Sequence, residues 1–139
     1  MLSDKAGAFL ADNHNAVLTT FRNSGGAQMS VVTCGLYKGR VAFTTTADRV
    51  KLVNLKRNPR CSLLVSKTDW WGYVVLEGRA DLLSPENTDS EELRLALRDV
   101  YRAASGQDHP DWEEYDQAMR DQRRSVVMVI PEHVYGTAA

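Results

Sequence analysis

The 139-residue chain has no excess of charge of either sign, no long apolar run and little cysteine. Its 17 Lys and Arg residues are balanced by 18 Asp and Glu residues, so the formal net charge is -1. Without a basic excess to neutralise phosphates, we expect no nucleic-acid partner. No apolar run approaches the roughly 18 residues that cross a bilayer, and the acidic N-terminal stretch is not typical of a signal peptide. We therefore expect a cytoplasmic protein without a membrane partner.

Cysteine and histidine are too sparse to predict a redox motif or a metal centre. Cys34 and Cys61 lie in apolar runs without the CxxC spacing of a zinc or dithiol site, and we expect both thiols to be buried. His14, His109 and His133 are isolated from one another, whereas metal sites need clustered ligands. The sequence also contains no GxSxG, HExxH, EF-hand or P-loop pattern. We predict neither a metal nor a nucleophilic triad.

The apolar periodicity predicts one domain, residues 1–139, in which strands predominate. Period-two stretches rich in β-branched residues are separated by dense turn signals, and they predict six strands, at 16–21, 27–37, 41–46, 60–66, 71–83 and 125–130. Helical periodicity predicts four helices, at 2–13, at 48–57, after a Thr88/Glu91 capping box, and at 111–123. Short turns between strands indicate an antiparallel arrangement, and closure into a small barrel avoids exposed sheet edges.

Two of these elements carry more specific expectations. In the helix at 48–57, Val50, Val53 and Leu55 are expected to face inward, while the basic residues face solvent. In the strand at 71–83, Gly78 is expected to mark a bulge or a close approach of another backbone.

The most suggestive chemistry lies at residues 44–51, TTTADRVK, where a strand passes into a helix. A helix N-terminus presents unpaired N–H groups that favour anions. Threonine hydroxyls add donors, and Arg49 and Lys51 add positive charge, with the arginine fork well suited to phosphate. From these residue types the stretch is a candidate phosphate cradle. A solvated basic helix face is the alternative interpretation.

Two further groups of residues have both a functional and a structural interpretation. Trp71 and Tyr73 are expected on one face of a strand, with Trp70 on the other, where the rings would stack on a planar ligand, fill the core or form a subunit contact. Gln28 and Ser30 share a strand face with Val32. These polar groups would bind the edge of a ligand or mark a solvated face, and the sequence pattern does not separate the two.

Several stretches of the chain together carry a resemblance to a known family, and these are NSGGAQMSVV, TTADRVKLVNLKRNPRCSLLV, WWGYVVLEGRADL, YRAASGQDHPDWEEYDQAM and VIPEHVYG. The chain resembles the pyridoxamine-5'-phosphate-oxidase-like split β-barrel family. Within it the chain is most similar to the flavin/deazaflavin oxidoreductases that use coenzyme F420. The second stretch is the most specific, because Arg-x-Lys-x-x-Asn-Leu followed by Asn-Pro-Arg is the family's cofactor-phosphate element.

The resemblance implies a mainly β (α+β) fold, a six-stranded antiparallel split β-barrel with peripheral helices. It also implies a homodimer with two equivalent sites at the subunit interface. Arg49 and Lys51 would hold the cofactor phosphate, helped by Thr45, Thr46 and Asn54.

The resemblance further implies a wall for the ring system of the cofactor. This wall would be formed by Ser30, Val31 and Val32, with Gln28 close by. Trp71 and Tyr73 of the other subunit would cover the bound cofactor.

The activity that the resemblance implies is hydride transfer between reduced F420 and an unsaturated or conjugated small-molecule substrate. Tyr73 is a candidate proton donor by residue type, and solvent is an equal alternative. An FMN oxidoreductase is the nearest alternative, because the same Arg and Lys serve either phosphate. Basic groups beyond the phosphate would favour F420, whose tail carries carboxylates, and Arg57 and Arg60 are candidates for that contact. A non-catalytic carrier of F420 or flavin is the second alternative, and haem binding lacks an evident axial histidine.

Overall fold

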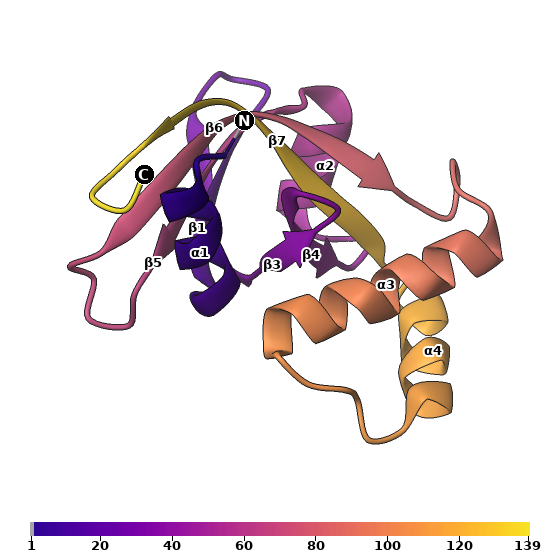
Figure 1. Cartoon of the computed structure of the whole chain (residues 1–139). Coiled ribbons are helices and arrows are strands. Elements are labelled where there is room, and N and C mark those ends of the chain that lie inside the picture. Colours follow the sequence, from indigo (N-terminus) through magenta and orange to yellow (C-terminus); the bar gives the residue numbers. More distant parts are fainter. Residues whose placement is uncertain (1) are drawn as a thin grey trace.

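The computed structural model describes residues 2–139, which form one seven-stranded antiparallel sheet and four helices (Figure 1). The elements along the chain are α1 (Asp4–Asp12), β1 (Asn15–Phe21), β2 (Ala27–Thr33), β3 (Gly35–Tyr37), β4 (Arg40–Thr45), α2 (Val50–Arg57), β5 (Arg60–Ser66), β6 (Tyr73–Leu83), α3 (Ser90–Ser105), α4 (Trp112–Asp121) and β7 (Ser125–Tyr135). The strands follow the spatial order β2-β1-β5-β6-β7-β4-β3. None of the helices within residues 2–139 is long and apolar enough to span a membrane.

The prediction of six strands is wrong, because the strand expected at 27–37 is divided at Cys34. Its first part, β2, pairs with β1, and its second part, β3, pairs with β4 at the opposite end of the strand order. The backbone N–H of Cys34 instead donates to the His14 carbonyl at 2.9 Å. Because one residue joins the two outermost strands, the sheet must roll round on itself.

The packing at Gly35 explains why the chain bends there, since α3 lies directly against it. A Cβ atom at Gly35 would lie 2.4 Å from the carbonyl carbon of Ala103. Only glycine allows two backbones to approach so closely. The apolar run at 27–37 carries no sign of this, because both parts have the composition of a strand.

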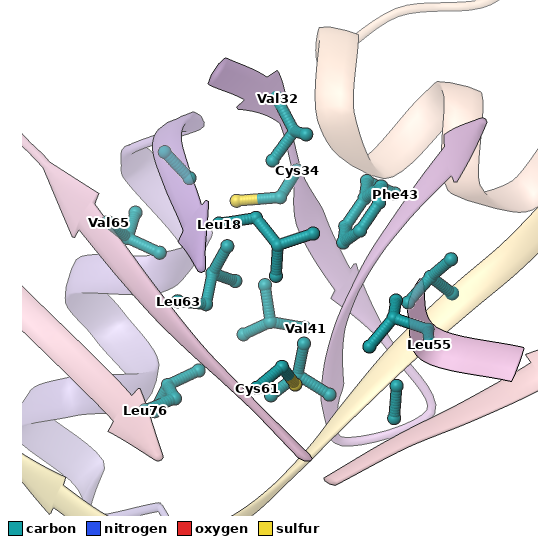
Figure 2. Close-up of a cluster of buried hydrophobic side chains, with 14 of the residues drawn as sticks. Leu18, Val32, Cys34, Val41, Phe43, Leu55, Cys61, Leu63, Val65 and Leu76 are labelled. Atoms are coloured by element: carbon teal, nitrogen blue, oxygen red, sulfur yellow. The ribbon is translucent and has the colours of Figure 1, made fainter. Parts of the chain in front are cut away.

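Apolar side chains from all sides of the rolled sheet fill its interior (Figure 2). Leu18, Val41 and Leu63 are among the most deeply buried of them. On β1 buried residues alternate with partly exposed ones, as a half-buried strand requires. Burying each side chain of this size contributes about 1.5–3 kcal/mol. Both cysteines are free and buried in this cluster, as predicted.

Strands β6 and β7 pair over nearly their whole length around an irregularity at Gly78. The register shifts between Glu77 and Gly78, and a Cβ atom at Gly78 would lie 1.9 Å from the Ile130 carbonyl oxygen. The expectation of a bulge or close approach at Gly78 is therefore confirmed. β7 extends to Tyr135, beyond its predicted end at residue 130. Pro131 is tolerated because the pairing with β4 ends at Val129, so its missing N–H removes no bond to β4.

Helices α3 and α4 lie together on one side of the molecule, away from the C-terminus (Figure 1). Their apolar faces form a second cluster with the outer face of β4 and β7. α3 begins after Asp89, whose side chain accepts hydrogen bonds from the N–H groups of Glu91 and Glu92. Asp89, rather than the predicted Thr88, is therefore the N-cap. The buried Asp116 of α4 joins the two helices through ion pairs with Arg94 and Arg98 of α3.

Helix α2 presents a different face to the core from the one predicted. Leu52, Asn54 and Leu55 are buried, whereas the side chains of Val50 and Val53 are 56% and 55% exposed. The prediction was right for Leu55 and wrong for both valines. The helix is short and begins at Val50 rather than at 48, so a small change in its start rotates the inward face.

Candidate functional site

A hollow of about 590 Å³ opens between the rolled sheet and the α3–α4 pair. This is within the range of small-molecule sites. One wall comes from β2, β4 and the start of α2, and it contains the predicted site residues Val31, Val32, Thr45, Thr46, Arg49 and Lys51. The opposite wall comes from α3 and α4, and its side chains include Tyr101, Tyr115 and Met119. The predicted phosphate stretch therefore lines the hollow, together with two residues of the predicted ring wall.

Three cations gather at the sheet side of this hollow, namely Arg49, Lys51 and Arg124. Within residues 2–139 none of them forms an ion pair. Partial burial, together with the charges of Arg49 and Arg124, lowers the pKa of the Lys51 ammonium below its ordinary value. Like charges held together without a counter-ion are a costly arrangement that an anionic ligand relieves. The electrostatics therefore favour an anion at this point.

Arg124 was not predicted as a site residue, and the pairing of β4 with β7 brings it to the hollow. Thr45 lies opposite Ser125 in that register, so the residue before β7 ends beside the threonines of β4. Arg124 donates to the Thr44 hydroxyl at 3.0 Å and to Gln122 Oε1 at 2.7 Å. The signal in the sequence was an arginine directly before a strand whose first five residues are all buried. Recognising it required knowledge of which strand pairs with β7.

The Thr45 hydroxyl completes the cluster, because it is buried and has no hydrogen-bond partner. Thr45 is 3% exposed, and within the described residues its Oγ1 is the buried side-chain polar atom left without a partner. Such atoms are rare in folded proteins, because an unpaired buried hydroxyl costs about 1–3 kcal/mol. A ligand oxygen in the hollow would satisfy it. Neighbouring Thr46 already donates to Asp48 at 2.8 Å, and this bond lowers the pKa of the Asp48 carboxyl.

The helical wall is apolar and aromatic rather than acidic. Tyr115 donates its hydroxyl proton to the Leu97 carbonyl at 2.8 Å, and burial raises its pKa to about 12. Tyr101 packs edge-on against Tyr115 and against Trp112. Tyr115 therefore stays neutral across the physiological range, and its proton is held by the backbone. The two rings give the hollow a rigid wall.

The structure brings Gln28, Ser30 and Asn54 to one another rather than to the hollow. Asn54 donates to the Thr20 hydroxyl, and Thr20 donates to Gln28 Oε1, each at 3.1 Å. The Gln28 amide in turn donates to the Ser30 hydroxyl, also at 3.1 Å. These four residues form a polar chain from α2 through β1 to β2.

Trp71 and Tyr73 lie at the turn between β5 and β6, outside the hollow of their own chain. The expectation that Trp70, Trp71 and Tyr73 follow one strand is wrong, because β6 begins at Tyr73. The backbone N–H of Trp71 donates a hydrogen bond to the Asp69 carboxylate at 2.9 Å, and Trp70 has a positive φ of 68°. The turn leaves the Trp71 side chain 85% exposed.

Within residues 2–139 no three His, Cys, Asp or Glu residues group as possible metal ligands. His14 Nδ1 lies 2.8 Å from the Cys34 carbonyl, and His109 packs among the aromatic rings of α3 and α4. Neither they nor His133 lines the hollow. Arg57 and Arg60 lie instead in a separate open hollow beside the β1–β2 hairpin.

A rolled antiparallel sheet with a basic hollow beside its second helix defines the class of small split-barrel proteins. The chain matches the family described as pyridoxamine 5'-phosphate oxidase over residues 2–138, and it belongs to that family. The resemblance to this family is therefore confirmed.

Solved structures with the same fold include proteins of different kinds. A conserved hypothetical protein of Mycobacterium tuberculosis, Rv2991, is 21% identical with a TM-score of 0.79, over 98% of this chain and 84% of that one. An F420 reductase is 21% identical with a TM-score of 0.65, over 96% and 98% of the two chains. A heme binding protein of Mycobacterium smegmatis is 19% identical with a TM-score of 0.67, and this chain aligns over its full length with 55% of that protein. At these identities the likeness establishes the fold.

Proposed function

We propose that the protein is an oxidoreductase that binds a phosphate-bearing redox cofactor in the hollow between β4, α2 and α3. The favoured cofactor is the deazaflavin F420, and FMN is the alternative. The observation that carries the proposal is the set of three cations without counter-ions, Arg49, Lys51 and Arg124, beside the unpartnered Thr45 hydroxyl. Family membership supports the same kind of ligand.

Different residues of the hollow would contact different parts of such a cofactor. Arg49, Lys51 and Arg124 would bind the phosphate through charge-assisted hydrogen bonds, and Thr45 would donate one more. Val31 and Val32 offer an apolar surface on β2 for the ring system. The bound cofactor supplies hydride-transfer chemistry, while the protein orients it and excludes water from one face. The substrate, an unsaturated or conjugated small molecule, would approach the open face.

A second copy of the chain would complete the site. Val31 is 82% exposed although it lines the hollow, and Met29, Val50 and Val53 are further exposed apolar residues on β2 and α2, which contact each other. An apolar patch of this kind is typical of a subunit interface. A two-fold dimer formed through it would repeat the site by symmetry. The exposed Trp71 would then cover the cofactor bound by the other subunit, and Tyr73 would lie beside it.

The carrier alternative differs from the enzyme only in turnover. Tyr115 is committed to the Leu97 carbonyl, so a proton needed after hydride transfer would come from Tyr73 of the other subunit or from solvent. Either proton source is compatible with catalysis. Haem is disfavoured by the position of all three histidines outside the hollow.

Fluorescence titration of the purified protein with F420 and, in parallel, with FMN tests the proposal. Micromolar or tighter binding of F420, followed by oxidation of reduced F420 in a screen of unsaturated acceptors, is the expected result. Tight binding without turnover on any acceptor would assign the protein as a carrier. Binding of neither cofactor would reject the proposed function and leave the basic cluster as an ordinary charged surface.

A further inference from the structure

The helical wall of the hollow carries three hydroxyl groups on an otherwise apolar surface. They belong to Tyr101 and Ser105 of α3 and to Tyr115 of α4. The remaining side chains that these two helices contribute to the hollow are apolar. A polar side-chain contact from this wall to a ligand must therefore come from one of the three hydroxyls.

Two of the three hydroxyls already have backbone partners. Tyr115 donates to the Leu97 carbonyl at 2.8 Å. The Ser105 hydroxyl lies 2.8 Å from the Tyr101 carbonyl and 2.9 Å from the Gln107 carbonyl. A hydroxyl has a single proton to donate, so neither group has one left for a ligand.

The Tyr101 hydroxyl differs from both, because it makes no hydrogen bond within residues 2–139. Its side chain is half-buried, and the hydroxyl itself is open to solvent. A phenol hydroxyl is both a donor and an acceptor of hydrogen bonds. Of the hydroxyls on the helical wall, the one on Tyr101 is therefore free to contact a ligand.

The ring that carries this hydroxyl is held by other aromatic rings. Its centroid lies 5.3 Å from that of His109, 5.8 Å from that of Trp112 and 5.2 Å from that of Tyr115. Trp112 is itself packed under the Arg102 guanidinium, which lies 4.6 Å from its ring centroid. A side chain fixed in this way loses little conformational freedom when a ligand binds.

We propose that the Tyr101 hydroxyl is a cofactor-binding contact, donating a hydrogen bond to an uncharged oxygen or nitrogen of the cofactor. This inference rests on the proposed function and adds a contact on the wall opposite the phosphate. Arg49, Lys51 and Arg124 would hold the phosphate at the sheet side, while Tyr101 would contact the cofactor from the helical side. The ligand of this hollow must then carry an uncharged hydrogen-bond acceptor in addition to its anion.

The substitution Tyr101→Phe tests this contact, because it removes the hydroxyl and keeps the ring with its aromatic neighbours. We expect the dissociation constant of F420, or of FMN if the protein prefers FMN, to rise about three- to tenfold, the scale of one hydrogen bond. Fluorescence titration measures it. Inorganic phosphate, followed by the rise in melting temperature that it causes, should bind the variant and the unsubstituted protein equally, because it needs only the cations of the sheet side.

Tyr115→Phe is the matched control, because it removes a hydroxyl from the same wall. That hydroxyl is bonded to the Leu97 carbonyl, so its loss should lower the melting temperature by about 2–6 °C. The affinity of the folded Tyr115 variant for the cofactor should stay within twofold of the unsubstituted protein. The two tyrosines thus separate a ligand contact from a structural bond.

The other outcomes overturn the inference in distinguishable ways. Unchanged cofactor affinity in the Tyr101→Phe variant overturns this inference alone. Equal weakening of phosphate and cofactor binding in that variant also overturns it, because the hollow as a whole would then have changed. Equal losses of cofactor affinity in the two tyrosine variants have the same meaning. Failure of the unsubstituted protein to bind either cofactor overturns the proposed function as well.

Discussion

The Asn54 amide donates a hydrogen bond of 3.1 Å to the Thr20 hydroxyl, joining α2 to β1 inside the wall of the barrel. Thr20 is fully buried, and its hydroxyl donates a hydrogen bond to Gln28 Oε1 on β2. The helix that carries Arg49 and Lys51 is therefore fixed to the strand that precedes Val31. The family resemblance implied that Asn54 helps to hold the phosphate, whereas its side chain here donates to β1 and supports the helix that carries Lys51.

Replacing Thr20 by Val keeps the shape of this side chain but leaves Asn54 and Gln28 without their partner. We expect the free energy of unfolding to fall by about 1–3 kcal/mol, the cost of unsatisfied buried polar groups. Denaturant titration measures the change. Thr19→Val on the same strand is the control, because Thr19 is half-buried and its side chain makes no hydrogen bond within residues 2–139. Equal losses in the two variants would contradict a special role for the Thr20 hydroxyl.

Replacing Lys51 by Ala should weaken cofactor binding by about 1.5–3 kcal/mol, the contribution of a hydrogen bond to a charged group. Fluorescence titration with F420 gives the dissociation constant directly. Lys56→Ala on the same helix is the control, because Lys56 forms an ion pair with Glu86 and does not line the hollow that contains Lys51. An unchanged dissociation constant in the Lys51 variant would remove this residue from the site.

The affinity for the cofactor should fall as the pH is raised, and the fall should begin below the range of an ordinary lysine. Partial burial and the neighbouring arginines lower the pKa of Lys51 from its ordinary value of 10.5. Its charged form, which binds phosphate, is therefore lost at a lower pH. Titrations between about pH 7 and 10 follow this loss. Lys51→Arg should extend binding to higher pH, and identical pH profiles for the two proteins would assign the decline to another group.

Asp116→Asn should destabilise the protein at neutral pH and have less effect in acid. The hydrogen bond from Arg98 lowers the pKa of the Asp116 carboxyl from its ordinary value of 3.8. A carboxyl with a lowered folded pKa adds stability above its ordinary value, and that stability is lost as the pH falls through the folded value. The gap in unfolding free energy between the two proteins should therefore narrow below about pH 4. A gap independent of pH would show that the Asp116 charge is unimportant.

If each site is built from two subunits, two variants that each bind the cofactor weakly should recover binding when they form mixed dimers. Trp71→Ala should weaken cofactor binding without unfolding the chain, because Trp71 is 85% exposed. A mixed dimer of the Lys51→Ala and Trp71→Ala chains contains one site with both residues intact. Refolding the variants together should thus recover up to half of the original sites in those dimers. No recovery, or a monomer in sedimentation at micromolar concentration, would exclude a site built from two subunits.

Local patterns predicted most elements of this fold, and the errors arise where distant segments decide. The alternation along β1 and the bulge at Gly78 were readable from neighbouring residues. The break at Cys34 was not, since it results from packing against α3. The orientation of Val50 and Val53 depends on where a short helix begins, and periodicity does not determine that to one residue.

Candidate site residues that are close together in the sequence could be predicted. Those that strand pairing brings together from distant segments could not. Thr45, Arg49 and Lys51 follow one another along the chain, and they meet in the hollow as expected. Arg124 comes from a segment about 75 residues further on, and only the β4–β7 register brings it beside them. Tyr101 and Tyr115 lie on helices whose periodicity marked an apolar face without showing what that face covers.

The position of β7 between β6 and β4 also determines when the sheet and its hollow can form during synthesis of the chain. Until Ser125–Tyr135 has emerged, the β3–β4 hairpin has no strand to attach it to β6. Arg124 directly precedes that strand, so the cation cluster of the hollow is completed in the same late step. A nascent chain stalled before this point would expose the unpaired edges of β4 and β6, which are hazards for aggregation. The proposed cofactor would not stabilise such a chain, because the hollow that would bind it exists only in the finished barrel.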